Sequence, residues 1–318
     1  MRLPKRTLAI ILLLINTICW GAALPFVKPA LEITTPFQHL FTRYVIACLL
    51  TLPLLFWYLR KQPKLFKSIR KIVILELIGT ILTLTLVYEG LARTTALEAN
   101  IITTAAPVFI VLGGILFLHE KQTKREWIGL FTSLLGTLIL VTHAGWNTLQ
   151  ITGSLFITGN VLLVLQNVSE AGFLLAAKKR YTSLPKMFVT TVSFWVGLIG
   201  FGILGMLKMR LGPLEFLADT WADFQQPTAA FAAIYMAIFG SIIGLTAYIA
   251  AQNLIEASEA SIFRYLQPLV YIPLAVGLLG ERFTVVTALS LALILLGVYL
   301  AEYRKSRTKK TRSVSRAG

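Results

Sequence analysis

The sequence predicts an all-α membrane protein in which ten transmembrane helices form two inverted five-helix repeats. The first observation is composition: 56% of the 318 residues are hydrophobic, only 14% are charged, and the mean hydropathy is +0.75. A soluble globule of this length cannot bury so much apolar surface, so the chain requires lipid as its solvent. The second observation is a set of ten long apolar stretches, and the third is a repeat within the chain.

Each apolar stretch reaches roughly 20 residues, the length that a helix needs to cross the hydrocarbon of a bilayer. Those in the first half lie at 7–27, 37–59, 72–91, 97–118 and 126–142. Those in the second half lie at 151–177, 187–207, 229–251, 260–279 and 283–303. We therefore expect a first five-helix repeat at 1–145, a second at 150–303, and a basic tail at 304–318.

A 45-residue segment occurs twice without a gap. Residues 96–140 align with 257–301 at an offset of 161 positions, and twelve of the 45 aligned pairs are identical, Pro107 with Pro268 among them. Duplication inside an apolar chain is typical of transporters built from two similar halves. Because five spans is an odd number, the second half must enter the membrane in the opposite direction to the first.

The positive charges predict the orientation, because cytoplasmic loops retain Lys and Arg while exported loops are depleted in them. With both termini in the cytoplasm, the cytoplasmic segments contain 23 of the 30 Lys and Arg residues. The net charge of +16 is therefore explained by membrane topology, and no nucleic-acid partner is expected. The expected location is the cell membrane, with the lipid bilayer as a permanent partner.

The sequence contains no motif for a metal, a nucleotide or a catalytic nucleophile. Cys19 and Cys48 lie in different spans and form no CxxC pair, which argues against a disulfide framework or a zinc site. The three histidines have no metal-ligand spacing, and neither a phosphate-binding loop nor a nucleophile elbow occurs. We therefore expect no cofactor, no metal and no enzymatic activity.

Polar side chains within the spans are the best candidates for a functional site, because a charge at the bilayer centre costs about 2.5–3.5 kcal/mol. The expected substrate-binding residues of spans 6 and 9 are Gln166, Asn167, Glu170, Arg264, Gln267 and Tyr271. Glu170 and Arg264 should lie at the same depth and so can meet. Two interpretations stay open. The pair only holds the bundle together, or Arg264 binds a substrate carboxylate or phosphate while Glu170 balances charge or carries a proton.

Spans 1 and 4 add three weaker candidates for substrate binding. Asn16 and Trp20 lie one turn apart near mid-membrane and suit a cavity wall, although core packing explains them nearly as well. Thr104 is the third candidate, although a threonine can equally bond its own helix backbone. Pro107 and Pro268, equivalent in the two repeats, are expected hinges because proline bends a helix, and a static kink is the alternative.

Residues distributed over both halves carry a family resemblance. In the first half these are Trp20-Gly21, Lys28, Arg43, Pro107, Glu120-Lys121, Gly129 and Gly136, of which three recur in the second half as Pro268, Glu281-Arg282 and Gly297. On these residues the chain resembles the EamA-type transporters of the drug/metabolite transporter superfamily. The resemblance implies two inverted repeats around a central cavity, alternating access, and export of amino acids or other small metabolites. It also implies that Glu120 and Glu281 are structural residues at helix ends.

Span 6 departs from the family's pattern, because an apolar or aromatic stretch is usual where this chain has Gln166-Asn167-Val-Ser-Glu170. The departure favours a small polar substrate, so we expect a secondary active transporter that exports polar metabolites. The alternatives are a carrier of drug-like or other organic solutes and, from another class, a non-transporting membrane receptor or assembly factor. The sequence leaves open whether protons drive the transport and whether the chain forms a homodimer.

Overall fold

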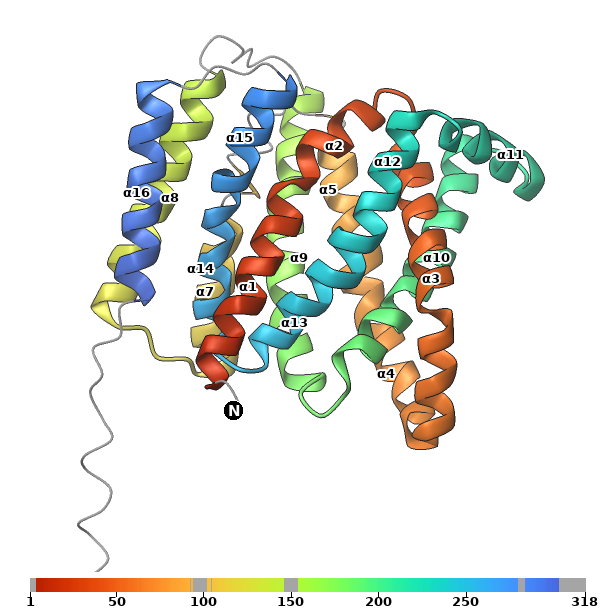
Figure 1. The fold of residues 1–318 in the computed structure, drawn as a ribbon, viewed down its shortest axis with the longest axis horizontal. Helices are drawn as coiled ribbons and strands as arrows, with labels where there is room; N and C mark the ends of the chain where they lie inside the picture. The colour runs from red at the N-terminus through yellow and green to blue at the C-terminus, as the bar shows by residue number, and fades with distance from the viewer. Residues whose placement is uncertain are drawn as a thin grey trace, which may run out of the picture.

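The computed structural model describes residues 4–91, 93, 102–103, 105–145, 154–279 and 284–302, and the regular elements of this part are all helices. In the first half these are α1 (Lys5–Gly21), α2 (Ala23–Ala30), α3 (Pro36–Lys61), η1 (Pro63–Leu65), α4 (Phe66–Glu76), η2 (Leu77–Leu82), α5 (Thr83–Leu91), α7 (Ala106–Leu118) and α8 (Lys124–Gly145). In the second half they are α9 (Ser154–Arg180), α10 (Lys186–Met209), α11 (Pro213–Phe224), α12 (Pro227–Tyr235), η3 (Met236–Leu245), α13 (Thr246–Gln252), α14 (Ala257–Ile262), η4 (Phe263–Leu266), α15 (Gln267–Leu279) and α16 (Val285–Glu302). Figure 1 shows them side by side in one bundle.

Six helical stretches of the described chain are long and apolar enough to cross a membrane. They are Lys5–Val27, Pro36–Lys61, Pro63–Gly90, Thr158–Arg180, Lys186–Met209 and Pro227–Gln252, and shorter apolar helices lie at Ala106–Leu118 and Val285–Ala301. Large apolar side chains such as Leu49, Leu116 and Leu289 are exposed on the outside of the bundle, as lipid-facing residues are. The prediction of an all-α, multi-pass membrane protein is therefore confirmed, while the ten spans and their inverted order stay predictions.

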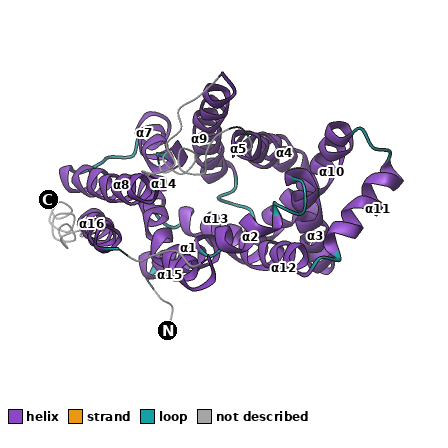
Figure 2. Cartoon of the chain, turned by 90° about the horizontal axis from the view of Figure 1, so that it is seen from above, coloured by secondary structure: helices purple, strands orange, loops and turns teal. Residues whose placement is uncertain are grey.

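Equivalent helices of the two predicted repeats have equivalent neighbours. Helix α3 packs against α10, and α8 against α16. Helix α1 packs against η3, α13 and α15, whereas α9 packs against η2, α5 and α7. Seen from above, α9, α5 and α4 form one row and α1, α2 and α12 another, with α8 and α16 at one end of the molecule (Figure 2). Exchanging the two halves therefore reproduces the contacts of α3 with α10 and of α8 with α16, and it relates the neighbours of α1 to those of α9.

Two π-helical segments interrupt equivalent helices. Segment η2 lies between α4 and α5, and segment η3 lies between α12 and α13. At the offset of 161, η2 falls entirely within η3, and Thr80 corresponds to Ser241. A π-helix widens the turn and leaves carbonyl groups without the usual helical partner, which is why such segments are frequent at functional sites. Composition does not distinguish them from α-helix, so sequence analysis did not find them.

The two expected hinge prolines lie in the first turn of α7 and of α15. Pro107 is in the first turn of α7, and Pro268 is the second residue of α15, directly after the 3₁₀ segment η4. Proline fits the first turn because the N–H that it lacks would have no helical partner there. Pro268 thus follows a 3₁₀ segment within a run of helical residues from 257 to 279, and the role of both prolines as hinges stays a prediction.

Small residues allow α8 and α16 to approach closely. A Cβ atom added at Gly297 would lie 2.3 Å from the Ser133 hydroxyl oxygen, and one added at Gly129 would lie 2.5 Å from the Gly297 carbonyl oxygen. The Ser133 hydroxyl also donates across the contact to the Ile294 carbonyl at 3.3 Å. Close backbone contact through glycine and serine is a common way to pack helices in lipid. Gly136 and Gly297, equivalent in the repeat, both lie in this contact.

Candidate substrate site

Glu170 and Arg264 form an ion pair between α9 and η4. The Arg264 Nη1 atom lies 3.0 Å from the Glu170 Oε1 atom, and the two side chains are 18% and 15% exposed, respectively. Gln166, one turn earlier on α9, donates its side-chain amide to Glu170 Oε2 at 3.0 Å. The predicted meeting of Glu170 and Arg264 is confirmed. The two opposite charges balance each other inside the bundle.

Several buried polar atoms near this pair have no hydrogen-bond partner among the described residues. They include the side-chain oxygens of Gln166 and Asn167 and the side-chain nitrogen of Gln267. A buried donor or acceptor without a partner costs about 1–3 kcal/mol. A polar ligand that forms a hydrogen bond to such an atom removes this cost. Gln267 follows η4 directly, and Gln166 and Asn167 lie on the same helix as Glu170. The arrangement offers donors, acceptors and both signs of charge to a small polar molecule.

Asn16 and Trp20 of α1 both donate to carbonyl oxygens of the π-helix η3. The Asn16 amide lies 3.0 Å from the Gly244 oxygen, and the Trp20 indole nitrogen lies 3.0 Å from the Gly240 oxygen. The Trp20 ring also stacks on Tyr248 with 5.6 Å between ring centroids. Tyr248 lies within electrostatic range of Glu170 and Arg264, so it connects the Trp20 contact to the ion pair.

Asn167 and Thr17 hold equivalent carbonyl groups ahead of α7 and α15, respectively. The Asn167 amide donates to the Ile102 oxygen at 2.6 Å, and the Thr17 hydroxyl donates to the Phe263 oxygen at 3.3 Å. Ile102 and Phe263 correspond at the offset of 161, and each precedes its proline by five residues. These side chains of α1 and α9 therefore bond the segments that directly precede α15 and α7, respectively.

Two of the remaining candidates complete the set of expected site residues. Tyr271 is half-buried in α15, one turn beyond Gln267. Thr104 lies outside the described residues. The structure thus brings Gln166, Glu170 and Arg264 together directly.

A second polar centre surrounds Glu76, which sequence analysis did not include among the site residues. Glu76 is 1% exposed and accepts hydrogen bonds from the Thr80 hydroxyl at 2.6 Å and the Tyr181 hydroxyl at 3.0 Å. Arg43 donates to the hydroxyl of Ser241 at 2.7 Å. The hydroxyls of Thr80 and Ser241 occupy equivalent places in the two π-helices. The first bonds the buried acidic residue Glu76, and the second bonds the buried basic residue Arg43. An acidic residue inside an apolar span is the signal that could have identified Glu76.

Glu120 joins the loop after α7 to the start of α14. Its carboxylate accepts from Lys178 at 2.8 Å, from the backbone N–H groups of Ala257 at 2.8 Å and Ser258 at 3.1 Å, and from the Ser258 hydroxyl at 2.7 Å. Burial alone would raise the pKa of Glu120, but the hydrogen bonds from Lys178, Ala257 and Ser258 outweigh it and lower the pKa below its usual value. Arg6 of α1 forms an ion pair of 3.1 Å with Glu259, which also lies on α14. These contacts lie at the lower end of the bundle in Figure 1, where α1 and α14 begin.

The family model of the EamA-like transporter family matches the chain twice, at residues 7–142 and 157–303. This chain belongs to the EamA-like transporter family. An uncharacterized transporter of Archaeoglobus fulgidus is 24% identical over 290 residues, which cover 91% of this chain and 96% of that protein. The uncharacterized transporter YcxC of Bacillus subtilis is 25% identical over 270 residues, or 84% and 83% of the two chains. The uncharacterized inner membrane transporter YedA of Escherichia coli K12 is 25% identical over 302 residues, or 91% and 88%.

A solved crystal structure has the same fold as this EamA-family chain. The TM-score is 0.72 at 14% sequence identity, with 93% of this chain and 97% of the other covered. A likeness at that identity concerns the fold alone. Family membership, transporter relatives and apolar helices together make this protein a multi-pass membrane transporter with a small-molecule substrate.

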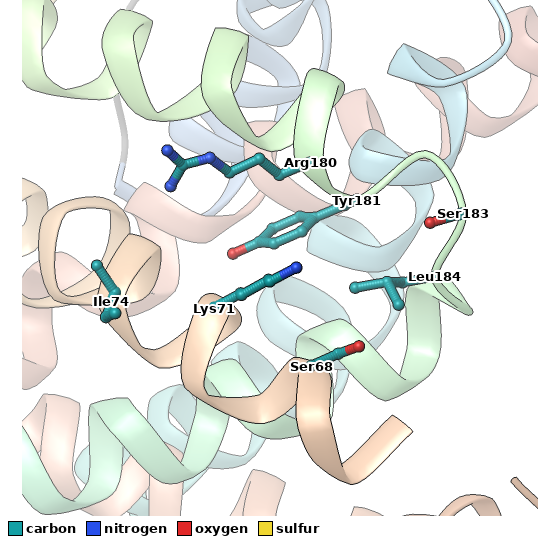
Figure 3. Close-up of a pocket in the computed structure, with 7 residues that line it drawn as sticks. All are labelled: Ser68, Lys71, Ile74, Arg180, Tyr181, Ser183 and Leu184. Atoms are coloured by element: carbon teal, nitrogen blue, oxygen red, sulfur yellow. The ribbon is translucent and has the colours of Figure 1, made fainter. Parts of the chain in front are cut away.

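Two pockets open on the EamA-family bundle away from the ion pair. The larger, of about 480 Å³, lies at the lower end and is lined by Ser68, Lys71, Ile74, Arg180, Tyr181, Ser183 and Leu184 (Figure 3). The smaller, of about 270 Å³, is lined by Thr85, Leu86, Glu89, Arg93, Thr158 and Leu162. Neither lining includes the residues expected to bind substrate. Tyr181 belongs both to the larger pocket and to the hydrogen bonds of Glu76, so this pocket reaches the second polar centre.

Proposed function

We propose that this protein is a secondary active transporter that exports small polar metabolites, amino acids among them, by alternating access. The observation that carries the proposal is the buried Glu170–Arg264 pair with unpartnered polar atoms close by. A net-neutral pair of opposite charges can exchange its internal partners for the charged groups of a polar solute at little electrostatic cost. The proposed substrate-binding residues are Asn16, Trp20, Thr104, Gln166, Asn167, Glu170, Arg264, Gln267 and Tyr271.

The proposed architecture is ten transmembrane helices in two inverted five-helix repeats, at 1–145 and 150–303, around a central cavity. Two matches of one family model support the duplication, and the exchangeable helix contacts support a twofold relation between the halves. Pro107 and Pro268 lie in the first turn of equivalent helices and serve as the hinges in this proposal. In this proposal both termini lie in the cytoplasm and the lower end of the bundle faces inward, which the distribution of positive charges supports. Cysteine labelling that found 60–71 and 178–186 on opposite sides of the membrane would contradict this orientation.

The experiment that tests the function is counterflow in proteoliposomes. Vesicles loaded with one unlabelled metabolite are diluted into the same labelled metabolite, over a panel of amino acids, other polar metabolites and drug-like solutes. A carrier gives transient, saturable uptake, whereas a channel gives unsaturable flux and a receptor or assembly factor gives none. Saturable uptake of a polar metabolite supports the proposal, and its absence over the whole panel contradicts it.

Variants of the ion pair test whether it binds the substrate. We expect Arg264→Gln to abolish counterflow. The double variant Glu170→Gln/Arg264→Gln should fold stably, because neither charge of the pair remains, but it should not recover counterflow. The control is Lys208→Gln, which removes the Lys208–Glu89 pair of 3.0 Å, whose lysine is 55% exposed. Normal counterflow by the double variant would show that the pair is only structural.

A further inference from the structure

Glu76 is a buried carboxyl group whose direct partners are neutral hydroxyl groups. Thr80 on η2 and Tyr181, directly after α9, donate to its two oxygens. Ser193 on α10 also lies near the carboxyl, and its hydroxyl donates to the Val189 carbonyl oxygen at 3.0 Å. The hydroxyl groups of Thr80 and Tyr181 carry no positive charge, so they do not balance the charge of an ionised carboxylate.

The basic side chains around Glu76 are directed elsewhere within the described part of the chain. On α3, Arg43 donates to Ser241 and lies over the Tyr44 ring, 5.2 Å from its centroid. On α10, Lys186 donates to the carbonyl oxygens of Tyr181 and Thr182. Tyr44, also on α3, is another titratable group within electrostatic range of the Glu76 carboxyl.

The remaining cations near this region are Lys64, Lys67, Arg70, Lys71 and Arg180, all of them exposed. Lys71 and Arg180 line the mouth of the pocket. None of the ion pairs among described residues includes Glu76. A buried carboxylate without a cation is costly, and the carboxyl group removes this cost by binding a proton. Glu170 differs, because Arg264 compensates its charge directly.

Tyr181 contacts both Glu76 and the pocket at the lower end, although only 1% of the residue is exposed. Its ring lies between Arg180 and Lys71 in the pocket of about 480 Å³ at the lower end (Figure 3). Its hydroxyl group donates to Glu76 Oε1. A tyrosine hydroxyl can pass its own proton to the carboxylate and take a replacement from water in the pocket. The net change is one proton bound by Glu76 and one lost from water at this end of the protein.

We propose that Glu76 is the proton-binding group that couples transport to a proton gradient, and that Tyr181 connects it to the pocket at the lower end. This inference rests on the proposed transport function. It assigns proton coupling to Glu76 in α4 in place of Glu170, and it leaves Glu170 as part of the substrate site. Residue 237, which corresponds to Glu76 in the second half, is alanine, so only one half carries the group.

Infrared spectroscopy tests proton binding without relying on transport. The purified protein in lipid should show the C=O stretching band of a protonated carboxylic acid, measured over the pH range in which it stays folded. We expect Glu76→Gln to remove this band and the control Glu170→Gln to retain it. A band that persists in Glu76→Gln, or its absence from the wild type at every pH, would overturn the inference.

Transport measurements test whether the bound proton is used. We expect Glu76→Gln to retain counterflow and to lose uphill accumulation driven by a pH gradient, because exchange does not require net proton movement. Retained counterflow also shows that the variant is folded. Accumulation by Glu76→Gln equal to that of the wild type would refute the coupling role. If the wild type itself gives no counterflow, the proposed function fails, and the infrared result still decides whether Glu76 binds a proton.

Tyr181→Phe tests the connection to the pocket. The change removes only the hydroxyl group, so we expect slower gradient-driven accumulation at an unchanged counterflow rate. Tyr58→Phe is the matched control, since Tyr58 lies at the same end of the bundle and packs its ring edge-on against Phe188. An equal rate of accumulation in Tyr181→Phe and wild type would exclude the tyrosine from the proton path.

Discussion

Replacing Glu120 by Gln should destabilise the contact between the loop after α7 and the start of α14. Glu120 is 8% exposed, and its carboxylate accepts four hydrogen bonds. One comes from Lys178, one from Ala257 and two from Ser258. In Glu120→Gln, the NH₂ group of the amide must face at least one of these donors. The substitution therefore removes the charge and also opposes donor to donor.

The magnitude follows from the burial of the two charged partners. Removing one partner of a buried ion pair costs about 3–5 kcal/mol. The Lys178 side chain is 20% exposed and also donates to the Ile255 carbonyl oxygen at 2.9 Å. Water and this carbonyl compensate part of its charge, so we expect about 3 kcal/mol for Glu120→Gln, at the low end of the range. Lys178→Met leaves Glu120 its other three donors and should cost about 1–2 kcal/mol.

The assay is equilibrium unfolding of the purified protein in mixed micelles, followed by circular dichroism. The double variant Glu120→Gln/Lys178→Met should cost less than the sum of the single variants, because both remove the same ion pair. Since the pKa of folded Glu120 is lowered, its contribution is complete above the usual glutamate value of about 4.3 and is lost as the pH falls through the folded value. The difference between wild type and Glu120→Gln should shrink over that interval. A cost below about 1 kcal/mol at neutral pH would refute the reasoning.

Two further predictions concern helix packing, and the same unfolding assay measures both. Gly297→Ala should lower the free energy of unfolding by about 1–3 kcal/mol, because the added Cβ would lie 2.3 Å from the Ser133 hydroxyl oxygen. The control is Gly277→Ala, whose added Cβ would have no atom within 4 Å and which should not lower stability in this way. Equal stability of the two variants would contradict the close contact of α8 and α16. Trp20→Phe keeps an aromatic ring on Tyr248 but loses the 3.0 Å bond to the Gly240 carbonyl, so it should cost about 1 kcal/mol, and an unchanged stability would argue against that bond.

Much of the fold could be predicted from hydropathy, because lipid forces the chain into long helices. The stretch expected at 187–207 is α10 (Lys186–Met209), and that expected at 37–59 lies within α3 (Pro36–Lys61). The meeting of Glu170 and Arg264 could also be predicted, since a fixed rise per residue places both at one depth. Depth along a helix is thus readable from the sequence when the span limits are known.

Contacts that depend on helix register and long-range packing could not be predicted in this way. The π-helical segments η2 and η3 consist mainly of apolar residues, as α5 and α13 after them do, so composition does not reveal them. Glu120 was expected at a helix end, but its partners Ala257 and Ser258 lie 137 and 138 positions away in sequence. Glu76 owes its surroundings to Tyr181, which is 105 positions away. The residue types were visible in the sequence, whereas their partners depend on the tertiary fold.

The halves of this protein agree in their scaffold and differ in their charges. The exchangeable helix contacts, the two π-helices and the bonded carbonyl groups of Ile102 and Phe263 occur in both halves. Two charged groups inside the spans are not repeated, since Arg264 corresponds to Thr103 and Glu76 to Ala237. In the proposed inverted arrangement, a symmetric scaffold gives the two access states similar free energies. A charged group present in one half only then responds differently in the two states, and we infer that direction and coupling arise from this difference.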